Sequence, residues 1–390
     1  MREMLHNNRR ILVYLVVSNF LLNFGFQIWQ TLFNNFAVEE LGIGPAGVSW
    51  VQAFREVPGL MGFLLGFLAL YLSEVRIMAF SLVLLGAGTM LTGQAYAMPF
   101  LLVSTVIMSI GFHFFYSSSS AVVLMVTEKR HAPRTLGQLN SLGAVAALVA
   151  TGVVWLLAQP WGYRTLFMIM GGLVVIGGLA LLPFGDAQTG LPPSRRVVVR
   201  RRYWLYYTLS FLMGSRRHIF TTFAIFLLVR EYGISVQTTA ILFLINSLVN
   251  AYALPWVGRL VGQLGERLML SVAFGSLALV FLGYAYIPYL PVLYVLFVID
   301  NLMFGVNLAL MTYFQKIAVT PEEITSNVSV EQAINHIAAV VIPIVGGMAW
   351  ELFGSQVLFL VGVGIVVIAL VLTQRMRTPS EPIAVLAGLG

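Results

Sequence analysis

The stretch GRLVGQLGERL, residues 258–268, repeats a pattern found 192 residues earlier in the chain, where residues 66–76 are GFLALYLSEVR. Glycine, leucine and glutamate recur at matching positions, which pair Gly66 with Gly258, Leu68 with Leu260, and Glu74 with Glu266. Each copy lies between two long apolar segments. A fixed spacing of this kind predicts that one structural unit of about 190 residues is used twice.

Two further matches support the repeat. WGYRTLF at 161–167 matches FGSQVLF at 353–359 with the same separation of 192, and ELGI at 40–43 matches EYGI at 231–234 with a separation of 191. We therefore expect an N-terminal six-helix half at 1–184, a basic cytoplasmic linker at 185–203 and a C-terminal six-helix half at 204–390. An even number of spans in each half gives both halves the same orientation in the membrane.

The composition is that of a membrane protein. Only 9% of the 390 residues are charged and 59% are hydrophobic, whereas soluble domains carry about 25% charged residues. A helix needs roughly 20 apolar residues to cross a bilayer. The sequence predicts an all-α integral membrane fold with twelve transmembrane helices, at 11–36, 46–71, 76–96, 99–126, 137–159, 164–184, 204–229, 236–261, 267–287, 289–318, 327–352 and 355–373.

The basic residues predict the orientation of these segments. With both termini inside, 17 of the 22 Lys and Arg residues fall on the cytoplasmic side. Only Arg164 and Arg230 fall outside, and Arg55, Arg216 and Arg217 fall within segments. This bias is the positive-inside pattern, and it predicts a multi-pass protein of the cytoplasmic (inner) membrane with both termini cytoplasmic. It accounts for most of the net charge of +7 without a nucleic-acid partner, and the linker RRVVVRRR is expected to contact anionic lipid.

The two loops resemble the signature of the major facilitator superfamily, Gly-x-Leu-x-Asp-Arg-x-Gly-Arg. The first copy keeps Gly66 and Leu68, and the second keeps Gly258, Leu260 and Gly265 and also carries Arg267. Gly262 and Gln263 replace the charged pair of the signature in the second copy. The resemblance implies two six-helix halves that alternate access to a central cavity, and it implies gating roles for Gly66, Gly258 and Arg267.

Charged and histidine side chains lie inside several predicted spans. A central Arg, Lys or Asp costs roughly 2.5–3.5 kcal/mol to insert, so such residues normally face a bundle interior or a wet cavity. Nine residues of this kind stand out: Arg55, Glu56, His113, Arg216, Arg217, His218, Asp300, Glu331 and His336. Glu331 lies near its helix start, so we expect it to act in gating or capping rather than to contact a substrate.

Polar residues also form stripes on individual spans. Five of them share one face of the first span within about 80°, at Asn19, Asn23, Gln27, Gln30 and Asn34. The fourth span has His113, Tyr116, Ser117 and Ser120 on one face, and the tenth aligns Asp300 with Asn307. Such stripes predict a hydrophilic path. The substrate-binding residues we expect are Arg55, Arg217, Gln27, Gln30, Asn23, His113 and Asn307.

Three consecutive basic residues on the seventh span cannot all face one cavity, because neighbours are about 100° apart. Arg217 shares the polar face, whereas Arg216 and His218 point to the flanks. Arg216 and Asp300 lie at compatible depths, and the superfamily layout lets Glu56 meet His336. The residues expected in proton coupling or charge pairs are Glu56, Arg216, His218, Asp300 and His336. An internal ion pair that serves only bundle stability is the alternative.

These features predict a secondary active transporter rather than an enzyme. The sequence lacks a phosphate-binding G-x-x-x-x-G-K-[ST] motif, so a proton gradient is the expected energy source. We expect a monomer that moves protons and a small, anionic organic solute, and that needs no cofactor. The alternatives are a proton-coupled exporter of hydrophobic compounds, a divalent metal transporter using His113, Asp300 and His336, and a receptor or assembly subunit without turnover.

Overall fold

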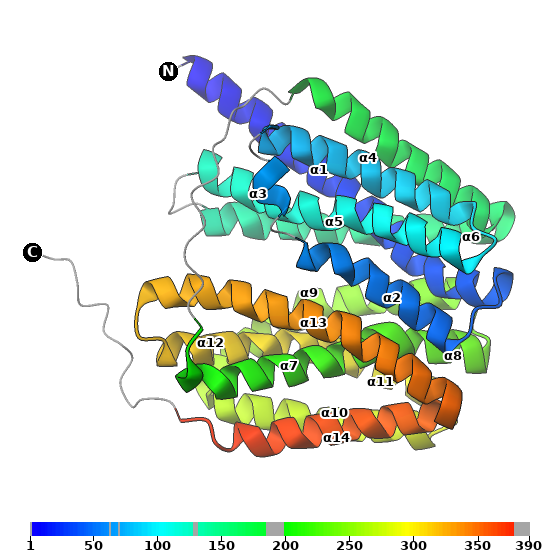
Figure 1. Ribbon diagram of the computed structural model, residues 1–390, viewed down its shortest axis with the longest axis vertical. Helices are drawn as coiled ribbons and strands as arrows, with labels where there is room; N and C mark the ends of the chain where they lie inside the picture. Colours follow the sequence, from blue (N-terminus) through cyan, green and yellow to red (C-terminus); the bar gives the residue numbers. More distant parts are fainter. Residues whose placement is uncertain (1, 62–63, 69–70, 128–131, 185–198, 378–390) are drawn as a thin grey trace, which may run out of the picture. The chain divides into compact units, whose positions relative to one another are not determined.

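The computed structural model describes residues 2–61, 64–68, 71–127, 132–184 and 199–377, and these residues form helices and short connections (Figure 1). Most of the predicted linker, residues 185–198, lies outside them. Contacts divide the chain into two compact units. Unit 1 combines Met1–Pro193 with Val229–Ser247, and unit 2 combines Ser194–Leu228 with Leu248–Gly390.

The first part of the chain builds most of unit 1. Its elements are α1 (Arg2–Asn35), the π-helix η1 (Phe36–Glu40), α2 (Pro45–Leu60), α3 (Leu64–Leu68), α4 (Glu74–Gly93), α5 (Met98–Val126), α6 (Ala132–Leu181) and the 3-10 turn η2 (Leu182–Phe184). Helix α4 packs on α5 and α6, α6 packs on α1, and α2 packs on α5. Gly162, with a φ of 75°, kinks α6 because it takes a left-handed conformation that favours glycine.

The second part begins with a 3-10 turn, η3 (Arg201–Tyr203). The elements that follow are α7 (Trp204–Ile219), the π-helix η4 (Phe220–Ala224), α8 (Ile225–Tyr232), α9 (Val236–Leu264), α10 (Glu266–Tyr286), α11 (Leu290–Leu302), the 3-10 turn η5 (Met303–Val306), α12 (Asn307–Ile317), α13 (Pro321–Phe353) and α14 (Ser355–Thr373). Within unit 2, α7 packs on α13 and α14, and α10 packs on α14.

Two glycines permit a close contact between α4 and α6 in unit 1. A Cβ on Gly86 of α4 would lie 2.6 Å from the carbonyl oxygen of Gly171 on α6, and a Cβ on Gly171 would lie 2.6 Å from the carbonyl oxygen of Gly86. Small residues let membrane helices approach until their backbones touch, which is how such helices associate without a hydrophobic driving force.

The segment Val229–Ser247 joins unit 1 through Asn35 at the end of α1. The Asn35 side-chain amide donates to the Ile234 carbonyl at 2.9 Å and to Glu39 at 2.8 Å. Its oxygen accepts from the Thr239 hydroxyl at 3.0 Å. Asn35 is fully buried, so these bonds satisfy a polar group that would otherwise destabilise the helix packing.

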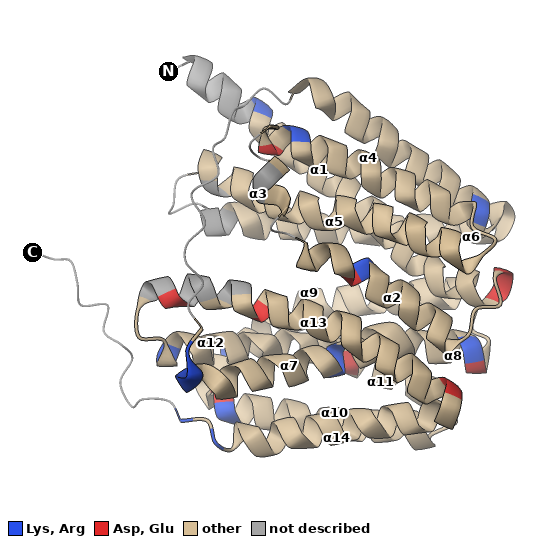
Figure 2. Cartoon of the chain, viewed as in Figure 1, with Lys and Arg blue, Asp and Glu red and all other residues tan. Residues whose placement is uncertain are grey.

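Ten helices of the described chain are long and apolar enough to cross a membrane. One of them, Thr135–Phe184, covers two predicted spans on either side of the kink at Gly162. The predicted span 46–71 corresponds to the shorter helices α2 and α3. Many apolar helices make this an integral multi-pass membrane protein, while the count of twelve in two six-helix repeats stays a prediction. Figure 2 shows that charged residues lie mainly at helix ends, with adjacent basic and acidic residues along α2 and near α7, and an acidic residue within α13.

Candidate functional site

An ion pair lies in the middle of unit 2. The Nη1 atom of Arg216, on α7, donates to Oδ1 of Asp300, on α11, at 2.8 Å. The two side chains are 1% and 0% exposed. Both residues lie well inside candidate membrane spans, Arg201–Tyr232 and Leu290–Ile317. The contact that their depths predicted is therefore present, and it is removed from water.

Two polar atoms of the ion pair lack hydrogen-bond partners. Within the part of the chain that the structure describes, Oδ2 of Asp300 and Nε of Arg216 have no hydrogen-bond partner although both atoms are buried. Leaving a buried charged group with unused donors or acceptors costs free energy, and groups of this kind are concentrated at functional sites. The pair is therefore poorly optimised for stability alone.

Arg217 differs from its neighbours as the helical phase predicts. It is exposed, whereas Arg216 and His218 are buried. The ring of Phe304, in η5, lies under both guanidinium groups, with centroid distances of 4.7 Å to Arg216 and 5.3 Å to Arg217. Phe304 was not among the predicted site residues, although its position four residues after Asp300 puts it about one helical turn away.

A second group of charges lies in unit 1. The Nη2 atom of Arg55 donates to Oε1 of Glu56 at 2.8 Å, and its guanidinium lies 5.9 Å from the rings of Phe26 and Trp29 on α1. Ligand atoms of Glu56 and His113 lie within 4.8 Å of each other. The structure thus brings Arg55, Glu56 and His113 together from α2 and α5. Their roles in substrate binding and proton coupling stay predictions.

The polar stripe of α1 meets polar residues of α5. The Asn19 side-chain amide donates to the Ser119 hydroxyl at 3.1 Å, and the Tyr116 hydroxyl donates to Oδ1 of Asn23 at 3.4 Å. Ser119 was not predicted, and it is buried as a packing hydrogen-bond partner. Further along the stripe, half-buried Gln27 donates to Thr31 at 3.0 Å, and Gln30 is half-buried as well.

Glu331 of α13 receives hydrogen bonds from two other helices of unit 2. The Tyr206 hydroxyl of α7 donates to Oε2 at 3.0 Å, and the Asn307 amide of α12 donates to Oε1 at 3.4 Å. Asn307 was expected to contact substrate and Glu331 to act in gating. The structure brings both into one buried cluster with Tyr206, whose only sequence signal is its aromatic ring beside the linker.

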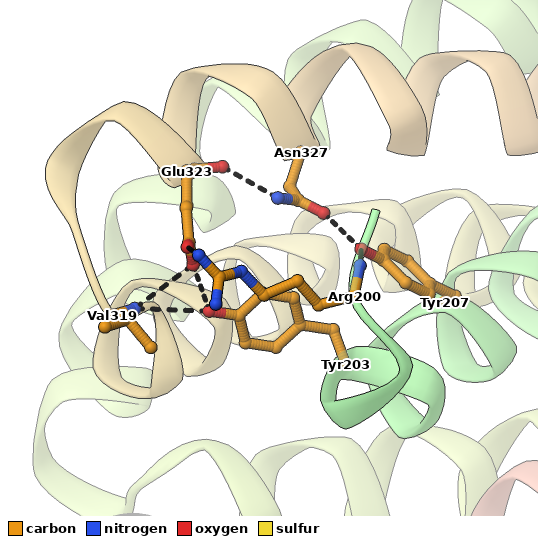
Figure 3. Close-up of polar contacts among 6 residues, drawn as sticks. All are labelled: Arg200, Tyr203, Tyr207, Val319, Glu323 and Asn327. Carbon is orange, nitrogen blue, oxygen red and sulfur yellow. Dashed lines mark hydrogen bonds and ion pairs between the residues drawn. The ribbon is translucent and has the colours of Figure 1, made fainter. Parts of the chain in front are cut away.

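A polar cluster joins the end of the linker to the start of α13 (Figure 3). Arg200 forms an ion pair with Glu323, and the Tyr203 hydroxyl donates to the same carboxylate. The hydrogen bond from Tyr203 lowers the pKa of Glu323 below its ordinary value of 4.5, against the opposing effect of burial. The Tyr207 hydroxyl donates to Asn327 at 2.5 Å. This cluster was not predicted from the sequence, because its members lie about 120 residues apart.

The prediction that Asp300 and Asn307 share one helix face rests on an assumption that the structure contradicts. It assumed one regular α-helix over 289–318, but the 3-10 turn η5 separates α11 from α12. A 3-10 turn advances by about 120° per residue rather than 100°, which moves the residues after it out of phase. The π-helix η4, after His218 and before α8, also changes the phase of the seventh span, but in the opposite sense, because a π-helix is wound more loosely than an α-helix.

The residues predicted to act in gating, and His336, lie on several helices. Arg267 lies in the first turn of α10 and donates to the Gln374 side chain at 3.1 Å and 3.3 Å. Gly258 lies on α9, where a Cβ would lie 3.6 Å from Leu308. Gly66 lies within α3, and His336 is half-buried on α13. Gating by these residues and the pairing of Glu56 with His336 stay predictions.

The long apolar helices define a class of protein, a polytopic α-helical membrane protein. The sequence profile of the Major Facilitator Superfamily matches residues 15–330, and the chain belongs to that superfamily. An MFS-type efflux pump of Mycolicibacterium smegmatis is 33% identical over 156 residues, a match that covers 36% of this chain and 35% of the pump. The chain thus matches about a third of that relative's length.

Solved structures show the same fold over nearly the whole chain. The crystal structure of the nucleoside transporter NupG has a TM-score of 0.76 at 16% identity and covers 94% of this chain and 98% of NupG. A bacterial homologue of the human lysosomal transporter Spinster, in an inward-facing and unoccupied conformation, has a TM-score of 0.75 at 15% identity and covers 96% and 99%. At these identities the likeness establishes the fold.

Proposed function

We propose that this protein is a proton-coupled secondary transporter of a small anionic organic solute, working by alternating access. The observation that carries the proposal is the buried ion pair of Arg216 with Asp300. Buried pairs are poor stabilisers compared with apolar packing of similar volume, so one in the middle of a membrane bundle indicates a functional role.

The pair supports coupling because its charge balance changes when a proton binds. A proton on Asp300 removes the negative partner and leaves Arg216 as an uncompensated buried cation. That state is costly in a low-dielectric interior, so α7 and α11 are driven toward an arrangement in which Arg216 finds water or an anion. Coupling of this kind needs a carboxylate with no other fixed partner, and Oδ2 of Asp300 has none among the described residues.

The charge of the proposed solute follows from Arg217. This side chain is exposed beside buried Arg216, and the guanidinium groups of both arginines lie over the ring of Phe304. An anion near Arg217 gains Coulomb attraction, which is strong where water is scarce. The ring of Phe304 holds the guanidinium from one side and adds an apolar surface for the organic part of the solute.

Transport by purified protein in proteoliposomes tests the proposal. An imposed pH gradient should drive saturable flux of at least one solute in a radiolabelled panel of carboxylates and organic phosphates. Arg217→Gln and Arg55→Gln should reduce that flux, whereas Arg230→Gln, at an exposed arginine near a helix end, should not. Unchanged flux in Arg217→Gln would show that the anion-binding role is wrong.

Export of hydrophobic compounds is a second candidate, favoured by the likeness to the mycobacterial efflux pump. In that case the charged groups would couple protons without touching an anionic solute. Ethidium in the same proteoliposomes separates the two candidates. Gradient-driven ethidium efflux that survives Arg217→Gln, with no flux of any anion in the panel, would favour export of hydrophobic compounds.

We also propose the protein's setting in the cell. The protein lies in the cytoplasmic (inner) membrane, and the bias of basic residues supports an orientation with both termini in the cytoplasm. A monomer is sufficient, because superfamily transporters of this length carry both halves in one chain. Protease protection of tags at the two termini in inside-out and right-side-out vesicles tests the orientation.

A further inference from the structure

An open cavity of about 800 Å³ lies where α10 begins and α14 ends, both in unit 2. Its lining includes the arginines Arg267 and Arg377, the polar side chains of Ser271 and Gln374, and the apolar Leu268. Neither the buried charges of α7 and α11 nor the cluster around Glu323 contributes to it. The cavity therefore belongs to neither site described above.

The cavity carries net positive charge. Glu266 also lines it, but Nζ of Lys316 lies 2.7 Å from its carboxylate and compensates its charge. Among the residues that the structure describes, neither Arg267 nor Arg377 has a carboxylate in ion-pair contact. Two arginines whose charge is not balanced locally attract an anion.

One of the arginines is held in place by its neighbours. Oε1 of Gln374 accepts hydrogen bonds from Nε and Nη2 of Arg267 at 3.3 Å and 3.1 Å. The Gln374 amide donates in turn to the Ser271 hydroxyl at 2.8 Å, which fixes the orientation of its oxygen. Because Gln374 is neutral, it orients the guanidinium of Arg267 without neutralising it.

The depth of the cavity identifies the kind of anion. Candidate spans begin at Glu266 and end at Thr373, so the cavity lies at the level of the lipid headgroups. Leu264 and Leu268, 48% and 50% exposed, lie on its lining and provide an apolar surface for an acyl chain. An arginine pair beside exposed leucines matches a phosphate group with hydrocarbon attached to it.

We propose that this cavity binds the headgroup of an anionic phospholipid, with its phosphate between Arg267 and Arg377. The lipid holds the start of α10 against the end of α14 from the membrane side. The proposal rests on membrane insertion and on these residues, and not on which solute the protein transports.

Thermal unfolding of the purified full-length protein in detergent tests the site. Phosphatidylglycerol should raise the apparent Tm of the wild type, whereas equimolar phosphatidylcholine or inorganic phosphate should raise it much less. Two arginines near a membrane surface contribute about 1 kcal/mol each. The lipid concentration for half-maximal shift should therefore rise roughly 10- to 30-fold in the double variant Arg267→Gln/Arg377→Gln.

Arg375→Gln is the matched control, because Arg375 is exposed nearby and does not line the cavity. It should keep the wild-type lipid response. The single variant Arg377→Gln, which changes no hydrogen bond of Gln374, should give an intermediate response and covers the case in which the double variant does not fold. An unchanged response in both arginine variants would overturn the proposal. So would equal shifts with phosphatidylcholine, or a full shift with inorganic phosphate.

Discussion

Arg216 and Asp300 form an ion pair at 2.8 Å between α7 and α11, and both side chains are excluded from solvent. The pair joins two helices that are separate in sequence, and Phe304 covers its cationic end. Two of its buried atoms, Nε of Arg216 and Oδ2 of Asp300, have no hydrogen-bond partner within the described chain. The pair combines strong electrostatic attraction with missing hydrogen bonds. This combination suits a contact that breaks and re-forms.

Removing one member of the pair should destabilise the protein strongly. Asp300→Asn or Arg216→Gln leaves a buried polar or charged group without its partner, and breaking buried pairs of this kind costs about 3–5 kcal/mol. The double variant Arg216→Met/Asp300→Leu should recover most of that loss, since apolar residues of similar volume replace the pair. Thermal unfolding in detergent measures both effects. Recovery of stability without recovery of transport would separate function from packing.

Substitution of Arg217 should affect solute binding rather than stability, the reverse of what we expect for Arg216. Because Arg217 is exposed, Arg217→Gln should change stability by no more than about 0.5 kcal/mol. The KM for an anionic solute should rise while the maximal rate changes less, because the lost attraction acts on binding. Initial-rate measurements in proteoliposomes check this split, and Arg217→Lys should restore part of the affinity. A large stability loss in Arg217→Gln would contradict the exposed position.

Gly171 and Gly172 provide a matched pair for the packing of α4 on α6. Gly171→Ala should destabilise by about 1–3 kcal/mol, because its Cβ would lie 2.6 Å from the Gly86 carbonyl oxygen and backbone cannot move aside cheaply. Gly172→Ala adds the same methyl group with only the Met90 sulfur near, at 3.8 Å, and should be close to neutral. Equal apparent Tm values for the two variants would contradict the close approach.

The cluster around Glu323 should make stability depend on pH in the acid range. The lowered pKa of Glu323 means that its charged form is favoured by folding. Its contribution is therefore full above the ordinary value of 4.5 and is lost as the pH falls through the lower value of the folded state. Glu323→Gln should be less stable than the wild type near neutral pH, and the difference should shrink in acid. Unfolding from pH 7 down to pH 3 follows this difference, and a gap that widens in acid would refute it.

Much of the site was predictable from sequence because the cost of membrane insertion makes charged residues conspicuous. Arg216, Arg217 and Asp300 stand out in apolar segments. Helical phase places Arg217 away from its two neighbours, and depth along the spans pairs Arg216 with Asp300. Both relationships depend only on regular α-helical geometry, which α7 keeps from Trp204 to Ile219.

The rest depends on packing that local sequence does not encode. The 3-10 turn η5 shifts the phase of the residues after it, so the alignment of Asp300 with Asn307 failed, and the π-helix η4 shifts the phase of the seventh span after His218. The attachment of Val229–Ser247 to unit 1 depends on hydrogen bonds of Asn35 with residues about 200 positions away. The roles of Phe304 and Tyr203 could not be predicted from the local sequence, because charged groups beside them come from other helices.

The most direct test of the central claim compares two modes of transport in Asp300→Asn proteoliposomes, using the solute that the panel identifies. Exchange of labelled for unlabelled solute needs no net proton movement, whereas accumulation against a gradient does. If Asp300 carries the proton, Asp300→Asn should retain exchange and lose accumulation driven by the pH gradient. Wild-type accumulation in Asp300→Asn would show that the Arg216–Asp300 pair is structural and that coupling resides elsewhere.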